Sequence, residues 1–207
     1  MNPLAMFPLG SVVLPGRILT LHVFEPRYRA LVQHCLAQAV PEFGVVLIER
    51  GSEVGGGDER REVGTVVQMV QVGETSDGRY AVMAVGTRRV RVERWLADDP
   101  FPLADVSDFA DTDDAMLIDD DQLAELTSAV RRSAALALEL GDPVGDPSEE
   151  ISPDPEVASY QLAAMAPLAD TDRYKLLCVP STAERLRRLA GMVADIHELL
   201  QFRLQSP

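Results

Sequence analysis

This sequence is poor in lysine, in cysteine and in long apolar runs, and each shortage excludes a class of protein. Lys175 is the only lysine in 207 residues and is followed by leucine, so the Gly-Lys-Ser/Thr of a nucleotide-binding P-loop is absent. Cys35 and Cys178 are too few for a disulfide framework and indicate a reducing compartment. No stretch approaches about 18 uninterrupted apolar residues, and no basic residue precedes Arg17. We therefore expect a cytoplasmic protein that contacts no membrane.

Catalytic and metal-binding motifs are equally scarce. The three histidines, His22, His34 and His197, are scattered, neither cysteine belongs to a C-x-x-C pair, and no Gly-x-Ser-x-Gly elbow occurs. We expect no catalytic residues, no cofactor and no metal site, and hence a protein that is not an enzyme. A hydrolase that uses an unrecognised arrangement of side chains stays open at this point.

Acidic residues are concentrated in one part of the chain. The formal net charge is −14, and residues 98–158 carry −16, whereas 1–97 and 159–207 each carry +1. Such an excess of negative charge repels phosphate backbones and anionic lipids. Ten aspartates fall within residues 98–121, which we interpret as an acidic last strand and linker. The alternative is an acidic surface that binds a basic partner.

The first half of the chain is predicted to form strands. Apolar and β-branched runs recur at short intervals with turns between them, which is typical of a small barrel or sandwich. Asp77-Gly78 predicts a hairpin turn with positive φ at both central residues. The run at 18–24 is apolar enough for a buried strand, and the glycine-rich segment at 51–61 is predicted to be a loop. The predicted strands cover residues 18–24, 43–48, 63–72, 80–85 and 89–93.

One helix interrupts these strands, and helices fill the second half. After Pro26, apolar residues recur at i, i+3, i+4 and i+7 and include Cys35, which we assign to the core. Ser181-Thr-Ala-Glu184 forms a capping box at the start of the last helix. We place a barrel subdomain at 1–117 and a helical bundle subdomain at 118–207. The remaining predicted helices cover residues 123–138, 155–165 and 172–178.

One basic cluster points toward nucleic acid. It consists of Arg88, Arg89, Arg91 and Arg94, but no RNA-binding pattern of aromatic residues accompanies it. We interpret Arg89 and Arg91 as the solvent face of an alternating strand. RNA binding is kept as the alternative function, although nucleic acid fits the charge of the chain poorly.

Several short motifs follow one another in an order that is characteristic of a known family. They are Phe7-Pro8-Leu9-Gly10, Val13-Leu14-Pro15-Gly16, Phe24-Glu25-Pro26-Arg27-Tyr28-Arg29, Gly86-Thr87-Arg88-Arg89 and Glu184-Arg185-Leu186. Together they resemble the N-terminal substrate-binding domain of the Lon protease, and the resemblance runs through nearly the whole chain. The Phe-Glu-Pro-Arg-Tyr stretch is the most specific of them.

This resemblance implies a fold and a function. The fold is α+β: a PUA-like small β-barrel with one inserted helix, followed by a C-terminal helical bundle. The domain is the one that Lon uses to engage protein substrates, and it is similar to the central part of cereblon. It implies a non-catalytic protein- or peptide-binding module without the ATPase and protease parts. The implied partner is an unfolded or extended polypeptide, or one specific protein.

The same comparison leads to candidate residues. Phe24, Glu25, Pro26, Arg27, Tyr28 and Arg29 are assigned structural roles. Glu25 is expected to cap the helix and to pair with Arg29 at i+4. The candidate polypeptide-binding residues are Val12, Val13 and Leu14, on a turn between two glycines. The alternative is that these three side chains belong to the core.

Overall fold

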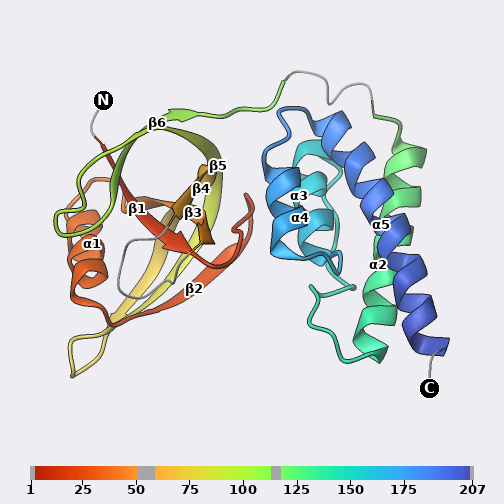
Figure 1. The fold of residues 1–207 in the computed structure, drawn as a ribbon, viewed down its shortest axis with the longest axis horizontal. Helices are drawn as coiled ribbons and strands as arrows, with labels where there is room; N and C mark the ends of the chain where they lie inside the picture. Colours follow the sequence, from red (N-terminus) through yellow and green to blue (C-terminus); the bar gives the residue numbers. More distant parts are fainter. Residues whose placement is uncertain (1–2, 51–58, 113–117, 206–207) are drawn as a thin grey trace. The chain divides into compact units, whose positions relative to one another are not determined.

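The structure is a computed structural model that describes residues 3–50, 59–112 and 118–205. It separates into two compact units, Met1–Ala110 and Asp111–Pro207, which we call the strand unit and the helical unit. The predicted boundary after residue 117 and most of the predicted loop at 51–61 lie outside the described residues. The strand unit holds one helix and the helical unit holds the others (Figure 1), so the predicted α+β class is confirmed.

In the described part of the strand unit, six strands form one sheet, and five of them close into a barrel-like ring (Figure 1). Their order is β2-β5-β4-β3-β1-β6, and an additional pairing of β5 with β6 closes the ring. β1 runs parallel to β3, and the other pairs are antiparallel. Among the described strands, β2 pairs with β5 alone. The bounds are β1 Leu4–Leu9, β2 Ile18–Val23, β3 Glu42–Arg50, β4 Glu59–Glu74, β5 Tyr80–Trp95 and β6 Leu103–Asp108.

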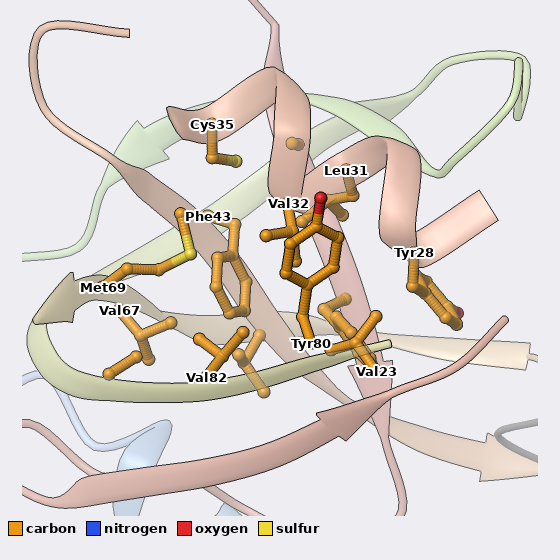
Figure 2. Packing of buried hydrophobic residues seen from close by; sticks show 14 of the residues in the cluster. Val23, Tyr28, Leu31, Val32, Cys35, Phe43, Val67, Met69, Tyr80 and Val82 are labelled. Carbon is orange, nitrogen blue, oxygen red and sulfur yellow. The ribbon is translucent and has the colours of Figure 1, made fainter. Parts of the chain in front are cut away.

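The core of the strand unit lies between α1 (Pro26–Leu36) and the strands, as Figure 2 shows. Leu31 and Val32 on α1 are buried among strand residues. Tyr28, from the same helix, stacks on Phe7 with ring centroids 4.0 Å apart. Cys35 is 1% exposed, so its assignment to the core is confirmed.

Both β4 and β5 are longer than predicted. β4 extends beyond the predicted 63–72 at both ends, and β5 covers both of the strands predicted at 80–85 and 89–93. At Gly86, between these stretches, an added Cβ would lie 2.5 Å from the carbonyl oxygen of Leu14. The turn prediction was wrong in one respect: Gly78 has φ +75°, but Asp77 does not have a positive φ. The hairpin loop is longer than two residues, since the Thr75 N–H bonds the Arg79 carbonyl at 2.9 Å, and it needs one left-handed residue only.

β2 is not the buried strand that its apolar sequence predicted. Ile18, Thr20 and His22 are exposed, and the alternate residues Leu19 and Leu21 are only partly buried. The strand lies at the end of the sheet order, where one face alone packs against the core. Its hydrophobicity therefore does not report its burial.

The described part of the helical unit contains four helices, which lie where the sequence pattern predicted them (Figure 1). Ser133 Oγ on the first lies 3.1 Å from His197 Nδ1 on the last, and Asp142 pairs with Arg203 at 2.6 Å, so these two helices run parallel. No helix within the described ranges is long and apolar enough to cross a membrane. The bounds are α2 Asp120–Glu139, α3 Pro155–Met165, α4 Asp170–Leu177 and α5 Thr182–Gln205.

A buried arginine holds several parts of the helical unit together. Arg185 is 0% exposed and forms an ion pair with Asp111, whose side chain is 5% exposed. Its Nε donates to Ser159 Oγ at 2.8 Å, Nη1 donates to the Val179 carbonyl at 3.2 Å, and the guanidinium lies 4.1 Å from the Tyr160 ring centroid. Because a buried charge is costly unless it is paired and hydrogen-bonded, these partners constrain one another.

We expect Asp111→Asn to lower the free energy of unfolding of the helical unit by about 3 kcal/mol, because it leaves a buried guanidinium without its counter-charge. Urea unfolding followed by far-ultraviolet circular dichroism measures the loss. Asp142→Asn is the matched control, since it removes an exposed ion pair with Arg203 and should change the stability little. Equal losses in the two variants would contradict the role assigned to Asp111.

A second prediction concerns Cys35. Burial raises the pKa of its thiol to about 12, and the charge of Glu42 adds to this effect. We expect an alkylating reagent at neutral pH to spare Cys35 in the folded protein while it reaches the partly exposed Cys178, as read by mass spectrometry. Because the folded pKa lies above the unfolded value of 9.0, the thiol's contribution to stability is complete below pH 9 and is lost as the pH rises toward 12. Rapid labelling of Cys35 before unfolding would contradict this assignment.

Candidate functional site

The three residues predicted to bind polypeptide lie mostly inside the protein. Val13 is 8% exposed and Leu14 is 2% exposed, whereas Val12 is partly exposed. The turn is anchored to β4, because the buried Thr65 hydroxyl donates to the Val13 carbonyl at 2.6 Å. Val13 and Leu14 thus present little surface to a ligand in this conformation, and a binding role for the turn stays a prediction.

The Phe24–Arg29 motif positions the start of α1. Glu25 is the N-cap residue, but its side chain makes no capping hydrogen bond and pairs with Arg27 at 3.2 Å. The expected pairing of Glu25 with Arg29 is not observed, since the carboxylate reaches the closer arginine. Phe24, which ends the preceding segment, is 54% exposed.

Exposed apolar side chains gather on the outward-facing side of three neighbouring strands. Ile18 is 67% exposed, Val70 58% and Met83 38%. The strand registers bring them together: Thr20 of β2 pairs with Met83 of β5, which pairs with Gln71 of β4. We call this surface the outer sheet face. It comprises Ile18, Thr20 and His22 of β2, Ala81, Met83 and Val85 of β5, and Gln68 and Val70 of β4.

The outer sheet face carries no Asp, Glu, Lys or Arg, and it ends at the open edge of β2. Edge strands in native proteins are normally protected by charges, above all lysine, or by proline. Residues 18–23 contain neither, and among the strands that the structure describes β2 has no partner on this edge, so the edge can pair there with a further strand. Leu19 and Leu21 point toward the core yet stay partly exposed, because no strand covers them on that side among the described residues.

A hollow of about 370 Å³ lies at the end of β2. Its walls are His22 and Phe24 on one side and the hairpin between β4 and β5 on the other. Asp77 on the hairpin pairs with Arg79 at 2.9 Å, and a hydrogen bond from the Thr75 hydroxyl lowers the pKa of the Asp77 carboxyl. The hollow therefore combines the aromatic ring of Phe24 with the ion pair of Asp77 and Arg79.

Sequence reasoning missed the outer sheet face. The available signal was the combination of alternating apolar residues and absent charge in residues 18–23. The same combination also predicts a buried strand. Whether β2 is buried depends on the strands beside it, and β2 lies at the end of the sheet order. The arrangement can bind through backbone hydrogen bonds and apolar contact.

The basic cluster proposed for RNA is largely paired. Arg88 binds Glu42 at 2.8 Å and Asp108 at 3.1 Å, and the hydrogen bond to Glu42 raises the pKa of the guanidinium. Arg94 binds Asp105 at 2.7 Å. These carboxylates neutralise positive charge that phosphate contacts would need.

The other two arginines of the cluster stack on one ring. The Cζ of Arg89 lies 4.4 Å from the centroid of Phe109, and that of Arg91 lies 4.6 Å from it. Arg89 is 4% exposed, so its predicted place on the solvent face was wrong. The aromatic ring, 20 residues further along the chain, covers it.

The hydrogen-bonded pair Ser133 and His197 links α2 to α5. Ser133 is 0% exposed, and the second ring nitrogen of His197 faces the Gln201 amide at 3.1 Å rather than a carboxylate. A Ser-His catalytic pair needs a reachable hydroxyl and an orienting acid. Within the ranges that the structure describes, no group of three His, Cys, Asp or Glu side chains could hold a metal ion.

Comparison with known families gives one match to almost the whole chain. The model of the ATP-dependent protease La (LON) substrate-binding domain covers residues 3–195. A LON peptidase N-terminal domain and RING finger protein of Schizosaccharomyces pombe is 23% identical in an alignment of 226 residues that covers 96% of this chain and 46% of that protein. Lon protease 2 of Herpetosiphon aurantiacus is 22% identical in an alignment of 201 residues that covers 96% of this chain and 24% of that protein. The chain thus spans less than half the length of these curated relatives.

Solved structures agree with this match. The crystal structure of a Lon N-terminal domain protein from Xanthomonas campestris has a TM-score of 0.67 and 28% identity, covering 92% of this chain and 98% of that one. The N-terminal domain of the Mycobacterium avium complex Lon protease has a TM-score of 0.59 and 18% identity, covering 94% and 99%, and shows the same fold. The match concerns the substrate-binding domain alone, without an ATPase or protease domain in this chain. Because the family model matches residues 3–195 of the 207, this chain belongs to the LON substrate-binding domain family.

Proposed function

We propose that this chain is a non-catalytic module that binds an extended, unfolded segment of another protein along the outer sheet face. The observation that carries the proposal is the open edge of β2, which is uncharged and flanked by the exposed side chains of Ile18 and Met83. The description of the matching family as a substrate-binding domain of a protease supports a polypeptide ligand.

Strand addition explains how one surface accepts many sequences. A segment paired with β2 satisfies its backbone through main-chain hydrogen bonds, which do not depend on side-chain identity. Its side chains alternate, so one set lies beside Ile18 and Thr20, and the other set covers Leu19 and Leu21. The hollow beside Phe24 takes one further side chain and gives the site a limited preference.

The turn before β2 has a supporting role in this proposal. Val12 is partly exposed, so a ligand can contact it, whereas the buried side chains of Val13 and Leu14 anchor the turn in the core. Cys35 and Cys178 form no disulfide, which fits action in the reducing cytoplasm. RNA binding is not proposed, because the arginines that suggested it are paired or stacked.

The test is fluorescence anisotropy of a labelled, permanently unfolded polypeptide titrated with the protein at physiological salt. We expect saturable binding, and we expect Ile18→Lys to weaken it about tenfold. The substitution removes an apolar contact of 1–2 kcal/mol, roughly, and places a charge on the edge. Val40→Lys is the matched control, because Val40 is 50% exposed in the same unit but lies outside the outer sheet face.

Three outcomes contradict the proposal: no binding of the wild-type protein, equal affinity of the Ile18→Lys variant, or an equal loss in both variants. Salt provides an independent check. Binding driven by apolar contact and backbone pairing should change little with salt, whereas phosphate-driven RNA binding weakens steeply.

A further inference from the structure

A groove of about 1240 Å³ runs between α2 and α5 and plays no part in the function proposed above. Its floor is formed by the buried side chains of Leu126, Leu186 and Val193. Exposed alanines, Ala190 and Ala194, lie one turn apart on the α5 wall, where larger side chains would close it. The helical unit therefore has a groove between two parallel helices, with alanine and leucine side chains between charged and polar ones.

The shape and chemistry of the groove select a helix as its occupant. The lining residues of α2 run from Asp121 to Ser133, which at about 1.5 Å per residue corresponds to about 18 Å, or roughly three helical turns. The backbone groups of α2 and α5 are bonded within each helix, so the groove offers no partners to an extended strand. A helix satisfies its own backbone and needs only an apolar face to fit.

Charge complementarity narrows the occupant further. Asp121 and Glu125 lie one turn apart on the α2 edge of the groove, and Glu198 lies on α5. Within the described residues, none of these carboxylates has an ion-pair partner. Two basic residues, Arg132 and Arg187, also line the groove. Arg187 forms an ion pair with Glu184.

The wider surroundings have the same sign. Residues 111–207 contain 19 acidic and 8 basic residues. Like charges at i and i+4 destabilise a helix, so Asp121 and Glu125 oppose each other unless a cation lies between or beside them. A cationic ligand would meet acidic groups near both ends of the groove.

We infer that this groove is a docking site for a basic amphipathic helix of a partner protein. The apolar face of that helix packs on Leu123, Ala190 and Ala194, whose side chains are at least partly exposed, and lysine or arginine at its flank meets Asp121 and Glu125. The groove lies in the helical unit and the outer sheet face lies in the strand unit, so the two sites use different residues.

The test uses a labelled helical peptide of about 14 residues, leucine and lysine in amphipathic order, long enough to cover the groove. Two peptides serve as controls: the same composition in scrambled order, and the same order with glutamate in place of lysine. In fluorescence anisotropy with the full chain at physiological salt, we expect the lysine peptide to saturate and both controls to bind at least tenfold more weakly. Equal binding of the glutamate or the scrambled peptide would overturn the inference.

Variants locate the binding. Ala190→Trp fills the groove and should weaken the lysine peptide at least tenfold, whereas Ala135→Trp, on an exposed part of α2 outside the lining, should not. Glu125→Gln should weaken binding several-fold, and Glu139→Gln, on the same helix away from the groove, should not. Circular dichroism verifies that each variant remains folded. The inference fails if Ala190→Trp and Ala135→Trp bind alike, or if Ile18→Lys on the outer sheet face removes peptide binding.

Discussion

The layout of the strand unit depends on how the edges of β5 are shared. A strand can hydrogen-bond one neighbour along each stretch of each edge, and β4 occupies one edge of β5 from Tyr80 to Arg91. The other edge is divided: Tyr80–Val85 pair with β2, and Val90–Trp95 pair with β6. Pairing with β6 closes the barrel, and pairing with β2 leaves that strand as an extension with an open edge. Closure of the core and exposure of the candidate site thus have a common origin, and Gly86 lies where one partner gives way to the other.

An open strand edge without charge is a hazard for a protein that has no use for it. Elsewhere the strand unit pairs its charges densely, as Arg88 does with Glu42 and Asp108. The contrast between this paired region and the uncharged outer sheet face favours a binding role for β2 over incidental exposure. The chain belongs to a family described as the substrate-binding domain of a protease, which is consistent with a polypeptide ligand.

The helical unit solves a different physical problem. Arg185 is completely buried, and its charge is compensated by the ion pair with Asp111 and by hydrogen bonds to Ser159 and Val179. These contacts fix the segments that carry the three partners relative to α5. The groove between α2 and α5 lies apart from this network, since Arg185 and its partners are not among the residues that line it. Two surfaces of different character follow, one suited to a strand and one suited to a helix.

Helical periodicity and turn residues identified the elements of this protein because both are local. The apolar spacing in α1 and the burial of Cys35 depend on residues within a few turns, and the motif order around Phe24–Arg29 identified the family. The burial of Arg89 could not be predicted, since it depends on the ring of Phe109 twenty residues away. The i, i+4 spacing also failed to predict the partner of Glu25, which pairs with Arg27 and not with Arg29.

The sequence by itself therefore determined the helices, most of the strands, the absence of a P-loop and the family to which the chain belongs, although it did not predict β1 and divided β5 in two. Only the tertiary structure decided that Ile18 faces outward, that Val13 and Leu14 are buried, and that α2 and α5 enclose a groove. Those properties depend on strand order, register and helix contacts between residues far apart in the chain. The local sequence around an apolar side chain is the same whether another part of the fold covers that side chain or leaves it exposed.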